Sequence, residues 1–357
     1  MMDLLSRRAQ ALVPYVPGEQ PHDKQYIKLN TNENPYPPSP KALAAIGGAA
    51  GENLRKYSQP EHENLRRLIA SNEGLPGEEY VYMGNGSDEV LAFAFAAFLP
   101  GQGEAPVLFP DVTYSFYPAY CELWGIPYKT VPLDLNWRIL PQDYAVKNGG
   151  VVFANPNAPT GQGLAEEEML DILRANPRVL VLVDEAYVMF GGVSMAKHIK
   201  DYPNLLVVRT LSKSHALAGL RVGYALGQPD LIDGIRRVKN SFNSYPLDSL
   251  AIAGAEAAIA DGAYVREICG RVTATREWFV AQLSELGFET VPSQTNFIFT
   301  QHEKHSGISL ASALKDKGVL VRRFARPEKI AGWLRMSIGT QEEMEIVVKV
   351  LRELVEA

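Results

Sequence analysis

The chain has 357 residues, of which 46% are hydrophobic and 21% are charged, and its formal net charge is −6. This length exceeds what one small core organises and suits a protein of two lobes. The negative charge and the lack of a basic stripe argue against nucleic acid and anionic membranes as partners. The longest apolar run, 90–99, is also far shorter than the roughly 20 residues that cross a bilayer.

Short apolar runs alternate with helical patterns through the middle of the chain. The run 179–183 contains only Val and Leu, which is typical of a strand buried on both faces. Such an alternation predicts an α/β domain with a mostly parallel sheet. We expect strands over 81–83, 107–109, 151–154, 179–183, 205–208 and 222–226, and helices over 87–99, after 113 and over 166–173.

The pattern changes after residue 246. A long helical stretch over 247–286, broken near Gly262, precedes expected strands at 296–299, 319–321 and 334–338 and a last helix over 342–355. This predicts a smaller α+β domain. We therefore expect an N-terminal arm over 1–30, a small domain from 31–50 and 247–357, and a large domain over 51–246, with the Pro-rich segment 30–40 joining the arm to the body.

The most informative stretch, residues 210–224, reads TLSKSHALAGLRVGY. A lysine in such a small-residue, partly apolar setting can lose its proton and form a Schiff base with an aldehyde, which is the chemistry available to Lys213. Thr210, Ser212 and Arg221 could hold a phosphate beside it. Together these residues predict a binding site for pyridoxal 5'-phosphate (PLP). For an isolated motif, the alternative is a solvated surface lysine.

Asp184 directly follows the predicted strand 179–183, at the carboxyl end where open α/β sheets bind ligands. A carboxylate there can pair with the pyridine nitrogen of PLP and keep it protonated, so that the ring takes up electrons released at the substrate carbon. Tyr187, three residues further on, could reach the phenolic oxygen of the cofactor. Taken alone, Asp184 is better explained as a helix N-cap and Tyr187 as a half-buried core residue.

The segment GNGSDE, residues 84–89, opens the predicted helix 87–99. Glycines allow close backbone approach and free amides at a helix start bind phosphate, so Gly86, Ser87 and Asp88 are candidates for the phosphate end of the cofactor. A plain N-cap role for Ser87 is an equally good interpretation of this motif alone.

Two loops after predicted strands could complete the site. Tyr114 offers an aromatic face that can stack on a pyridine ring, although a core aromatic is its alternative. The segment NPNAPTG, residues 155–161, follows the strand 151–154, and beside Asp184 it becomes a loop that contacts the phenolic oxygen O3'. An ordinary turn is the alternative, because Asn, Pro and Gly all favour one.

Two arginines stand in β-rich segments of the predicted small domain. Arg322 follows the run VLV, and Arg335 lies in LRMSIGT, residues 334–340. Arginine is suited to a bidentate grip on carboxylate or phosphate, so this pair suggests a substrate with an anionic group. Surface ion pairs are the alternative.

In this order, the motifs resemble those of the fold-type I, class II aminotransferases over nearly the whole chain. The stretches LNTNENPY (29–36), GNGSDE (84–89), TNFI (295–298), VR (321–322) and LRMSIGT (334–340) are similar to the histidinol-phosphate aminotransferases. The resemblance implies PLP as cofactor, a large domain with a mostly parallel sheet, a smaller α+β domain and a homodimer. It departs at Ala158, where the family usually has asparagine, so Asn157 is the residue assigned to O3'.

The resemblance also assigns roles to residues. Tyr57 matches a tyrosine that reaches the cofactor phosphate from the neighbouring subunit, and Tyr15 matches one of the N-terminal arm near the substrate. It implies substrate contacts for Asn85 and Asn296. Catalysis would rest on Lys213, Asp184 and Tyr187, with Arg322 and Arg335 meeting the anionic end of either substrate.

The implied reaction transfers an amino group from L-histidinol phosphate to 2-oxoglutarate in a ping-pong manner, giving imidazole acetol phosphate and glutamate in histidine biosynthesis. An aromatic amino acid aminotransferase and a PLP-dependent decarboxylase of a phosphorylated amino acid remain alternatives. A PLP-binding regulator would need an appended DNA-binding domain, for which the chain has no room.

The remaining features suggest location. The N-terminus has no signal-peptide pattern, and Cys121 and Cys269 are far apart and lack partners for a metal site. We therefore expect a cytoplasmic protein with free thiols and no metal.

Overall fold

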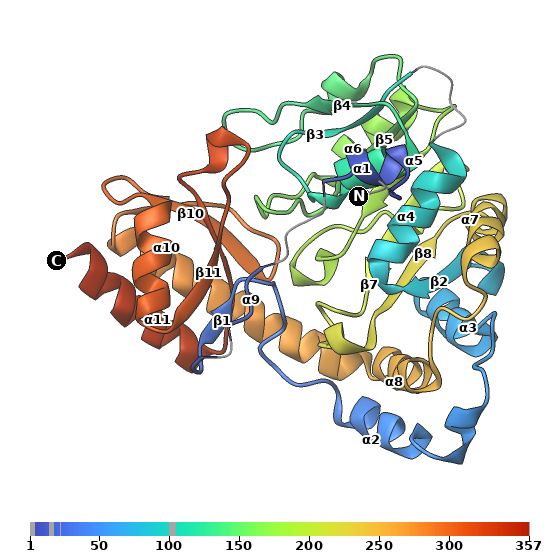
Figure 1. Cartoon of the computed structure of the whole chain (residues 1–357), viewed down its shortest axis with the longest axis horizontal. Coiled ribbons are helices and arrows are strands. Elements are labelled where there is room, and N and C mark those ends of the chain that lie inside the picture. The colour runs from blue at the N-terminus through green and yellow to red at the C-terminus, as the bar shows by residue number, and fades with distance from the viewer. Residues whose placement is uncertain (1–3, 14–17, 22, 100–104, 357) are drawn as a thin grey trace.

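The computed structural model describes residues 4–13, 18–21, 23–99 and 105–356. The strands in these ranges form two sheets, which are well separated in Figure 1. The smaller sheet, with β10 and β11, lies on the left, and the larger sheet, with β7 and β8, lies on the right. The long helix α9 (Gly262–Glu285) begins next to α8 (Ser249–Ala260) and packs against β9 and β10 of the smaller sheet.

The larger sheet has seven described strands in the order β2-β8-β7-β6-β5-β3-β4. From β7 to β4 all neighbours are parallel, whereas β8 is antiparallel to both β7 and β2. The predicted α/β fold with a mostly parallel sheet is therefore confirmed. The strands are β2 (Val81–Asn85), β3 (Val107–Pro110), β4 (Tyr128–Val131), β5 (Gly150–Ala154), β6 (Val181–Asp184), β7 (Leu205–Thr210) and β8 (Val222–Leu226).

This topology brings several chain segments to one edge of the sheet. Because β8 is antiparallel to both of its neighbours, β2 and β7 run in the same direction. The start of β8 therefore lies at the same edge of the sheet as the carboxyl ends of β2, β3, β5, β6 and β7. Asp184 ends β6, and Thr210 ends β7 opposite Gly223 of β8. Ligands of open α/β sheets bind at this edge.

Side chains of the central strands alternate between two cores, as the two-residue period of a strand requires. In β6, Val181 and Val183 pack into a core that also contains Leu65 of α3 (Glu63–Asn72) and Ile172 of α6 (Glu166–Ala175). Leu182 points the other way, into a core with Leu91 of α4 (Gly86–Phe98) and Ile235 of α7 (Pro229–Phe242). Helices therefore cover both faces of the larger sheet, as the continuous apolar run predicted.

The smaller sheet has five described strands in the order β1-β11-β12-β10-β9, and only the β1–β11 pair is parallel. Arg322 and Arg335 are direct partners on the adjacent strands β11 and β12. The strands are β1 (Ile27–Leu29), β9 (Phe288–Val291), β10 (Phe297–His302), β11 (Val319–Arg323) and β12 (Leu334–Ser337).

Helix ends follow ordinary capping chemistry. At α11, Thr340 Oγ1 accepts from the Glu343 amide and Glu343 Oε2 accepts from the Thr340 amide, which forms a capping box. The remaining helices are α1 (Arg7–Ala11), α2 (Pro40–Ala49), α3 (Glu63–Asn72), α4 (Gly86–Phe98), α5 (Phe116–Trp124), α6 (Glu166–Ala175), α7 (Pro229–Phe242), α10 (Gly307–Asp316) and α11 (Gln341–Val355). None of the helices in the described ranges combines the length and apolar character needed to cross a bilayer.

The packing differs from the predicted domain ranges in two places. Helices α2 and α8, predicted to lie in the small domain, pack against each other, and their Ala-rich faces join the core beneath the larger sheet. Strand β1, predicted to lie in the N-terminal arm, is part of the smaller sheet because its backbone pairs with β11. Apart from these corrections, the division into an arm and two domains remains a proposal.

Candidate active site

A small cavity of about 110 Å³ lies at the carboxyl edge of the larger sheet. Most of the residues predicted to bind the cofactor meet here, although they come from five separate stretches of sequence. The cavity is lined by Ser87, Asp88, Tyr114, Ala154, Ala158, Asp184, Ala186, Tyr187, Thr210, Ser212, Lys213 and Arg221.

Lys213 follows β7, and its amine points into this cavity. The Lys213 Nζ donates a hydrogen bond to the backbone oxygen of Thr31 at 3.2 Å, and it lies 5.9 Å from the centre of the Tyr187 ring. Burial, together with the positive charge of Arg335, lowers the pKa of Lys213 to about 8. A much larger fraction of this amine is therefore neutral at pH 7 than in an ordinary lysine, and a neutral amine is the nucleophile that an aldehyde requires.

Asp184 is buried at the end of β6. Its Oδ2 accepts a hydrogen bond from the Tyr117 hydroxyl at 3.0 Å, and its Oδ1 accepts from the Ala186 amide at 3.1 Å. Burial raises the pKa of Asp184 to about 6, against the effect of these two hydrogen bonds. A protonated ring nitrogen placed opposite would favour the ionised carboxylate. Tyr117 was not predicted from the sequence, although it lies on α5 only three residues after the predicted Tyr114.

Hydroxyls and one guanidinium form the other end of the cavity. Thr210 Oγ1 donates to Ser212 Oγ at 2.9 Å, and Arg221 Nη1 lies 3.5 Å from the same Ser212 oxygen. Ser87 stands in the first turn of α4, where backbone N–H groups are free. This set of neutral and cationic donors is suited to one phosphate group.

Glycine is required where α4 meets β8. Gly86 has φ of +77°, and a Cβ at this position would collide with the guanidinium of Arg221. A Cβ at Gly223 would collide with the backbone nitrogen of Ser87. These two glycines keep the helix start and Arg221 close together, which leaves a cradle of the kind a phosphate occupies.

Asp88 connects the aromatic wall of the cavity to its cationic end. Its Oδ1 accepts from the Tyr114 hydroxyl at 2.6 Å, and its Oδ2 lies 3.0 Å from Arg221 Nη2. Tyr114 also packs edge to face on Tyr117, with ring centres 5.7 Å apart. Asp88 therefore orients both groups, whereas its predicted direct contact with the cofactor remains a prediction.

The loop after β5 does not place Asn157 as predicted. Asn157 Nδ2 donates to Val112 O at 2.9 Å and to Thr160 Oγ1 at 3.0 Å, and its Oδ1 accepts from Thr113 Oγ1 at 2.8 Å. Ala158, not Asn157, lines the cavity. This geometry does not support the predicted contact between Asn157 and O3' of the cofactor, because the Asn157 side chain already makes three hydrogen bonds within the protein.

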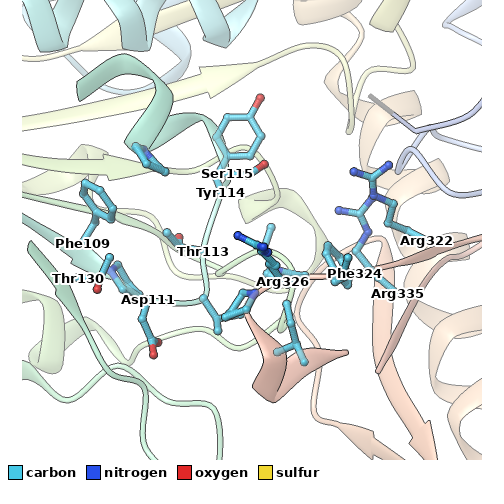
Figure 2. A pocket seen from close by; sticks show the side chains of 18 of the residues that line it. Phe109, Asp111, Thr113, Tyr114, Ser115, Thr130, Arg322, Phe324, Arg326 and Arg335 are labelled. Carbon is cyan, nitrogen blue, oxygen red and sulfur yellow. The ribbon is translucent and has the colours of Figure 1, made fainter. Parts of the chain in front are cut away.

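A larger cavity of about 510 Å³ adjoins the first and shares Tyr114 and Ala158 with it. Figure 2 shows this cavity with Arg322 and Arg335 on one side and the residues that follow β3 on the other. Arg335 Nη2 donates to Asn30 O at 2.9 Å. Arg326 also lines this cavity, and it was not predicted from the sequence because it lies in an irregular segment after β11.

A strap formed by residues 30–34 crosses between the two sheets and contacts the site at several points. Asn34 Nδ2 donates to the backbone oxygen of Lys213 at 3.0 Å, and Asn32 Nδ2 donates to the Tyr187 hydroxyl at 2.9 Å. Asn296 Nδ2 donates to Asn32 O at 3.0 Å. Asn296, predicted to bind substrate, is fully buried and holds this strap, and it does not line either cavity.

Three predicted residues lie apart from the cavities or outside the described ranges. Tyr57 is 83% exposed and stacks on Tyr245, with ring centres 4.6 Å apart. Asn85 Nδ2 donates to Pro246 O at 2.9 Å. Tyr15 lies outside the described residues. The predicted substrate contacts of Asn85 and Tyr15 and the cofactor contact of Tyr57 therefore remain predictions.

The family described as aminotransferase class I and II matches residues 24–351. The chain belongs to this family. It is 54% identical over 343 residues to histidinol-phosphate aminotransferase 1 of Pseudomonas fluorescens Pf-5, covering 96% of this chain and 97% of the relative. It is 52% identical over 344 residues to histidinol-phosphate aminotransferase 2 of Thiobacillus denitrificans, covering 96% of this chain and 96% of the relative.

A solved structure shares the fold of this aminotransferase. The histidinol-phosphate aminotransferase of Sinorhizobium meliloti, in complex with pyridoxal-5'-phosphate, superposes with a TM-score of 0.88 at 25% identity and covers 100% of this chain and 98% of its own. The predicted enzyme class and the resemblance stated from the motifs are therefore confirmed.

Proposed function

We propose that this aminotransferase binds PLP in the smaller cavity and transfers an amino group from L-histidinol phosphate to 2-oxoglutarate, a step of histidine biosynthesis. The names of relatives more than half identical to the chain support this substrate. The observation that carries the proposal is the placement of two arginines around a larger cavity that adjoins the Lys213 cavity.

The residues of the smaller cavity fit the cofactor. When bound, PLP supplies an aldehyde that reacts with an amine and a ring that takes up electrons released at the substrate carbon. Asp184 holds the proton at the ring nitrogen, Tyr114 excludes water from one face, and Arg221 and the start of α4 hold the phosphate. The neutral amine of Lys213 is the base placed to take a proton from the substrate carbon that carries the amino group.

The larger cavity explains how one site accepts two unlike substrates. Arg322 and Arg335 face the cavity from adjacent strands, and guanidinium groups bind phosphate and carboxylate with similar geometry. Histidinol phosphate carries its phosphate on the carbon next to the one that bears the amine, and 2-oxoglutarate carries a carboxylate next to its keto carbon. Both anions reach the same pair of arginines in this proposal.

An amino-donor panel with 2-oxoglutarate tests the substrate. Histidinol phosphate is compared with histidinol, phenylalanine, tyrosine and threonine phosphate in the parent protein and in Arg335→Leu. A charge-assisted contact is worth about 1.5–3 kcal/mol, so Arg335→Leu lowers kcat/KM for histidinol phosphate and for glutamate by at least roughly tenfold. Arg237→Leu, an exposed arginine on α7, is the matched control and leaves both values unchanged.

The alternatives give different results in this panel. If histidinol works as well as its phosphate, or if phenylalanine has the higher kcat/KM, the enzyme is an aromatic amino acid aminotransferase. Release of carbon dioxide from threonine phosphate without amino transfer would instead identify a decarboxylase.

We also propose a cytoplasmic homodimer. Exposed apolar side chains gather near one loop and the end of α7, where Tyr57 stacks on Tyr245 and Phe242 is 73% exposed. Exposed aromatic groups of this kind mark interaction surfaces, and a second copy of the chain is the occupant that would bring Tyr57 to a cofactor phosphate. The two cysteines are buried and free, as expected in a reducing compartment.

A further inference from the structure

Asn32 is a buried residue of the strap whose polar groups all have partners. Its φ is +55°, a left-handed conformation that residues other than glycine adopt at a cost. Its backbone N–H donates to Ser337 Oγ at 2.9 Å, and its backbone oxygen accepts from Asn296 Nδ2 at 3.0 Å. Strained residues persist where their surroundings fix them, and they concentrate at functional sites.

The hydrogen bonds to Ser337 determine which end of the Asn32 amide faces Tyr187. Ser337 Oγ accepts the Asn32 N–H at 2.9 Å and donates its own proton to Asn32 Oδ1 at 3.1 Å. The opposite end, Nδ2, is therefore the donor that meets the Tyr187 hydroxyl at 2.9 Å. Because the Tyr187 oxygen accepts this bond, its own proton remains available to a different acceptor.

Tyr187 and Lys213 meet the strap at consecutive residues. Lys213 Nζ donates to Thr31 O, and the Tyr187 hydroxyl accepts from Asn32. In PLP, the carbon that carries the phenolic oxygen O3' is next to the carbon whose aldehyde reacts with lysine, and the phosphate arm is on the other side. With its phosphate held near Arg221, the cofactor would turn O3' toward Tyr187, which lines the same cavity.

The loop after β5 brings no amide side chain to the cavity. Just before the Pro-Thr-Gly of this loop, a methyl group, that of Ala158, lines the cavity. The neighbouring Asn157 is held by three bonds within its loop. Among the described residues of the cavity, Tyr187 is then the donor beside Lys213 that O3' can use.

We infer that Asn32 is a positioning residue that sets the direction of the Tyr187 hydroxyl proton, so that Tyr187 donates to O3' of the cofactor. This inference rests on the proposed use of PLP. Ser337 fixes the amide of Asn32, Asn32 donates to Tyr187, and Tyr187 donates to O3'. Asn32 itself acts only through Tyr187.

The test is a pH titration of the visible absorption of the bound cofactor in the full-length holoenzyme. A hydrogen bond donated to O3' draws negative charge from that oxygen and weakens its hold on the proton at the lysine nitrogen. Tyr187→Phe removes this donor, and a bond to a charged oxygen corresponds to a rise of about one pH unit in the midpoint. Asn32→Asp places an acceptor opposite Tyr187, turns its proton away from O3', and raises the midpoint by a similar amount.

The double variant separates positioning from simple charge. If Asn32 acts through Tyr187, adding Asn32→Asp to Tyr187→Phe produces no further rise. A full additional rise shows that the new carboxylate acts by its charge and overturns the inference, as does an unchanged midpoint in Asn32→Asp alone. Should Asn32→Asp fail to fold, Ser337→Ala frees the amide to reverse and gives a smaller rise, and no rise there overturns the inference.

This experiment distinguishes the inference from the proposed function. The titration needs bound cofactor and no substrate, so it is independent of the donor panel. If PLP forms no absorbing complex with the parent protein, the cofactor proposal fails. If the complex forms and the variants titrate like the parent, only the role of Asn32 fails.

Discussion

Asp184→Asn is predicted to make the cofactor-free protein more stable while it removes activity. In the structure, Asp184 is buried and receives hydrogen bonds from Tyr117 and Ala186, which are both uncharged. Burial raises its pKa from 3.8 to about 6. Asparagine has the same shape and does not titrate. Its oxygen can accept from the Ala186 amide, and its NH2 group can donate to the Tyr117 oxygen, which reverses the direction of that hydrogen bond.

The size of the effect follows from the pKa of Asp184. A folded-state pKa above the unfolded value means that the folded state binds the proton more tightly, so stability falls as pH rises from about 4 to about 6 and then levels off. The rise of about two units corresponds to at most about 3 kcal/mol at neutral pH. For 357 residues, an unfolding entropy of about 2.1 cal/mol/K per residue converts this into a Tm difference of about 4 °C.

The assay is thermal or urea denaturation of both proteins without cofactor, between pH 4 and pH 8. We expect equal stability near pH 4 and a more stable Asp184→Asn protein at pH 7.5, with Asp171→Asn on the exposed face of α6 as control. Adding PLP should stabilise the parent more than the variant, because only a carboxylate pairs with a protonated ring nitrogen. In single-turnover experiments, the variant should react far more slowly than the parent protein. A variant that is no more stable than the parent at pH 7.5 would refute the reasoning.

Three further outcomes are expected. Acetylation of the cofactor-free protein, mapped by mass spectrometry with exposed lysines as reference, should be half-maximal at Lys213 near pH 8. Arg335→Leu should raise that midpoint, since Arg335 lowers the pKa of Lys213, and a parent midpoint near about 10.4 contradicts this. Mixing Tyr57→Phe with Lys213→Ala protein should restore part of the activity through hybrid dimers, and a monomer by light scattering would exclude it. Glu185→Gln should lower the free energy of unfolding by about 1.5–3 kcal/mol, because Glu185 is buried 2.9 Å from Arg209, which keeps Glu73 as a second partner; urea denaturation checks this.

The sequence predicted those parts of the fold that local patterns encode. The strands 205–208 and 222–226 were expected where β7 and β8 lie, because buried strands are continuous apolar runs. Strand β4 was missed, since three of its four residues are exposed at the edge of the sheet and leave no apolar run. Strand β9, with a mixed pattern of buried and exposed residues, was missed for a similar reason.

Site residues were predictable where a motif sits at a strand end. Asp184 and Lys213 follow apolar strands, and the topology of an α/β sheet brings such positions together. Asn32 and Tyr117 act through partners 155 and 67 residues away, and no local pattern encodes those contacts. Asn157 was assigned to the cofactor from its motif alone. A motif shows that an amide is present, but it does not show in which direction the amide points.

The charged groups of the cavity are matched to a ligand more than to one another. In the described structure, no ion pair joins Lys213 to Asp184; one loses its proton more easily than usual and the other holds its proton more tightly. Arg221 is paired with Asp88 but remains partly exposed. An aldehyde for the amine, a protonated ring nitrogen for the carboxylate and a phosphate for the guanidinium would satisfy all three groups at once, and these three features occur together in PLP. Burial of the charged forms of Asp184 and Lys213 is unfavourable in the cofactor-free protein. This free energy is regained when the cofactor binds, so it contributes to the affinity for the cofactor.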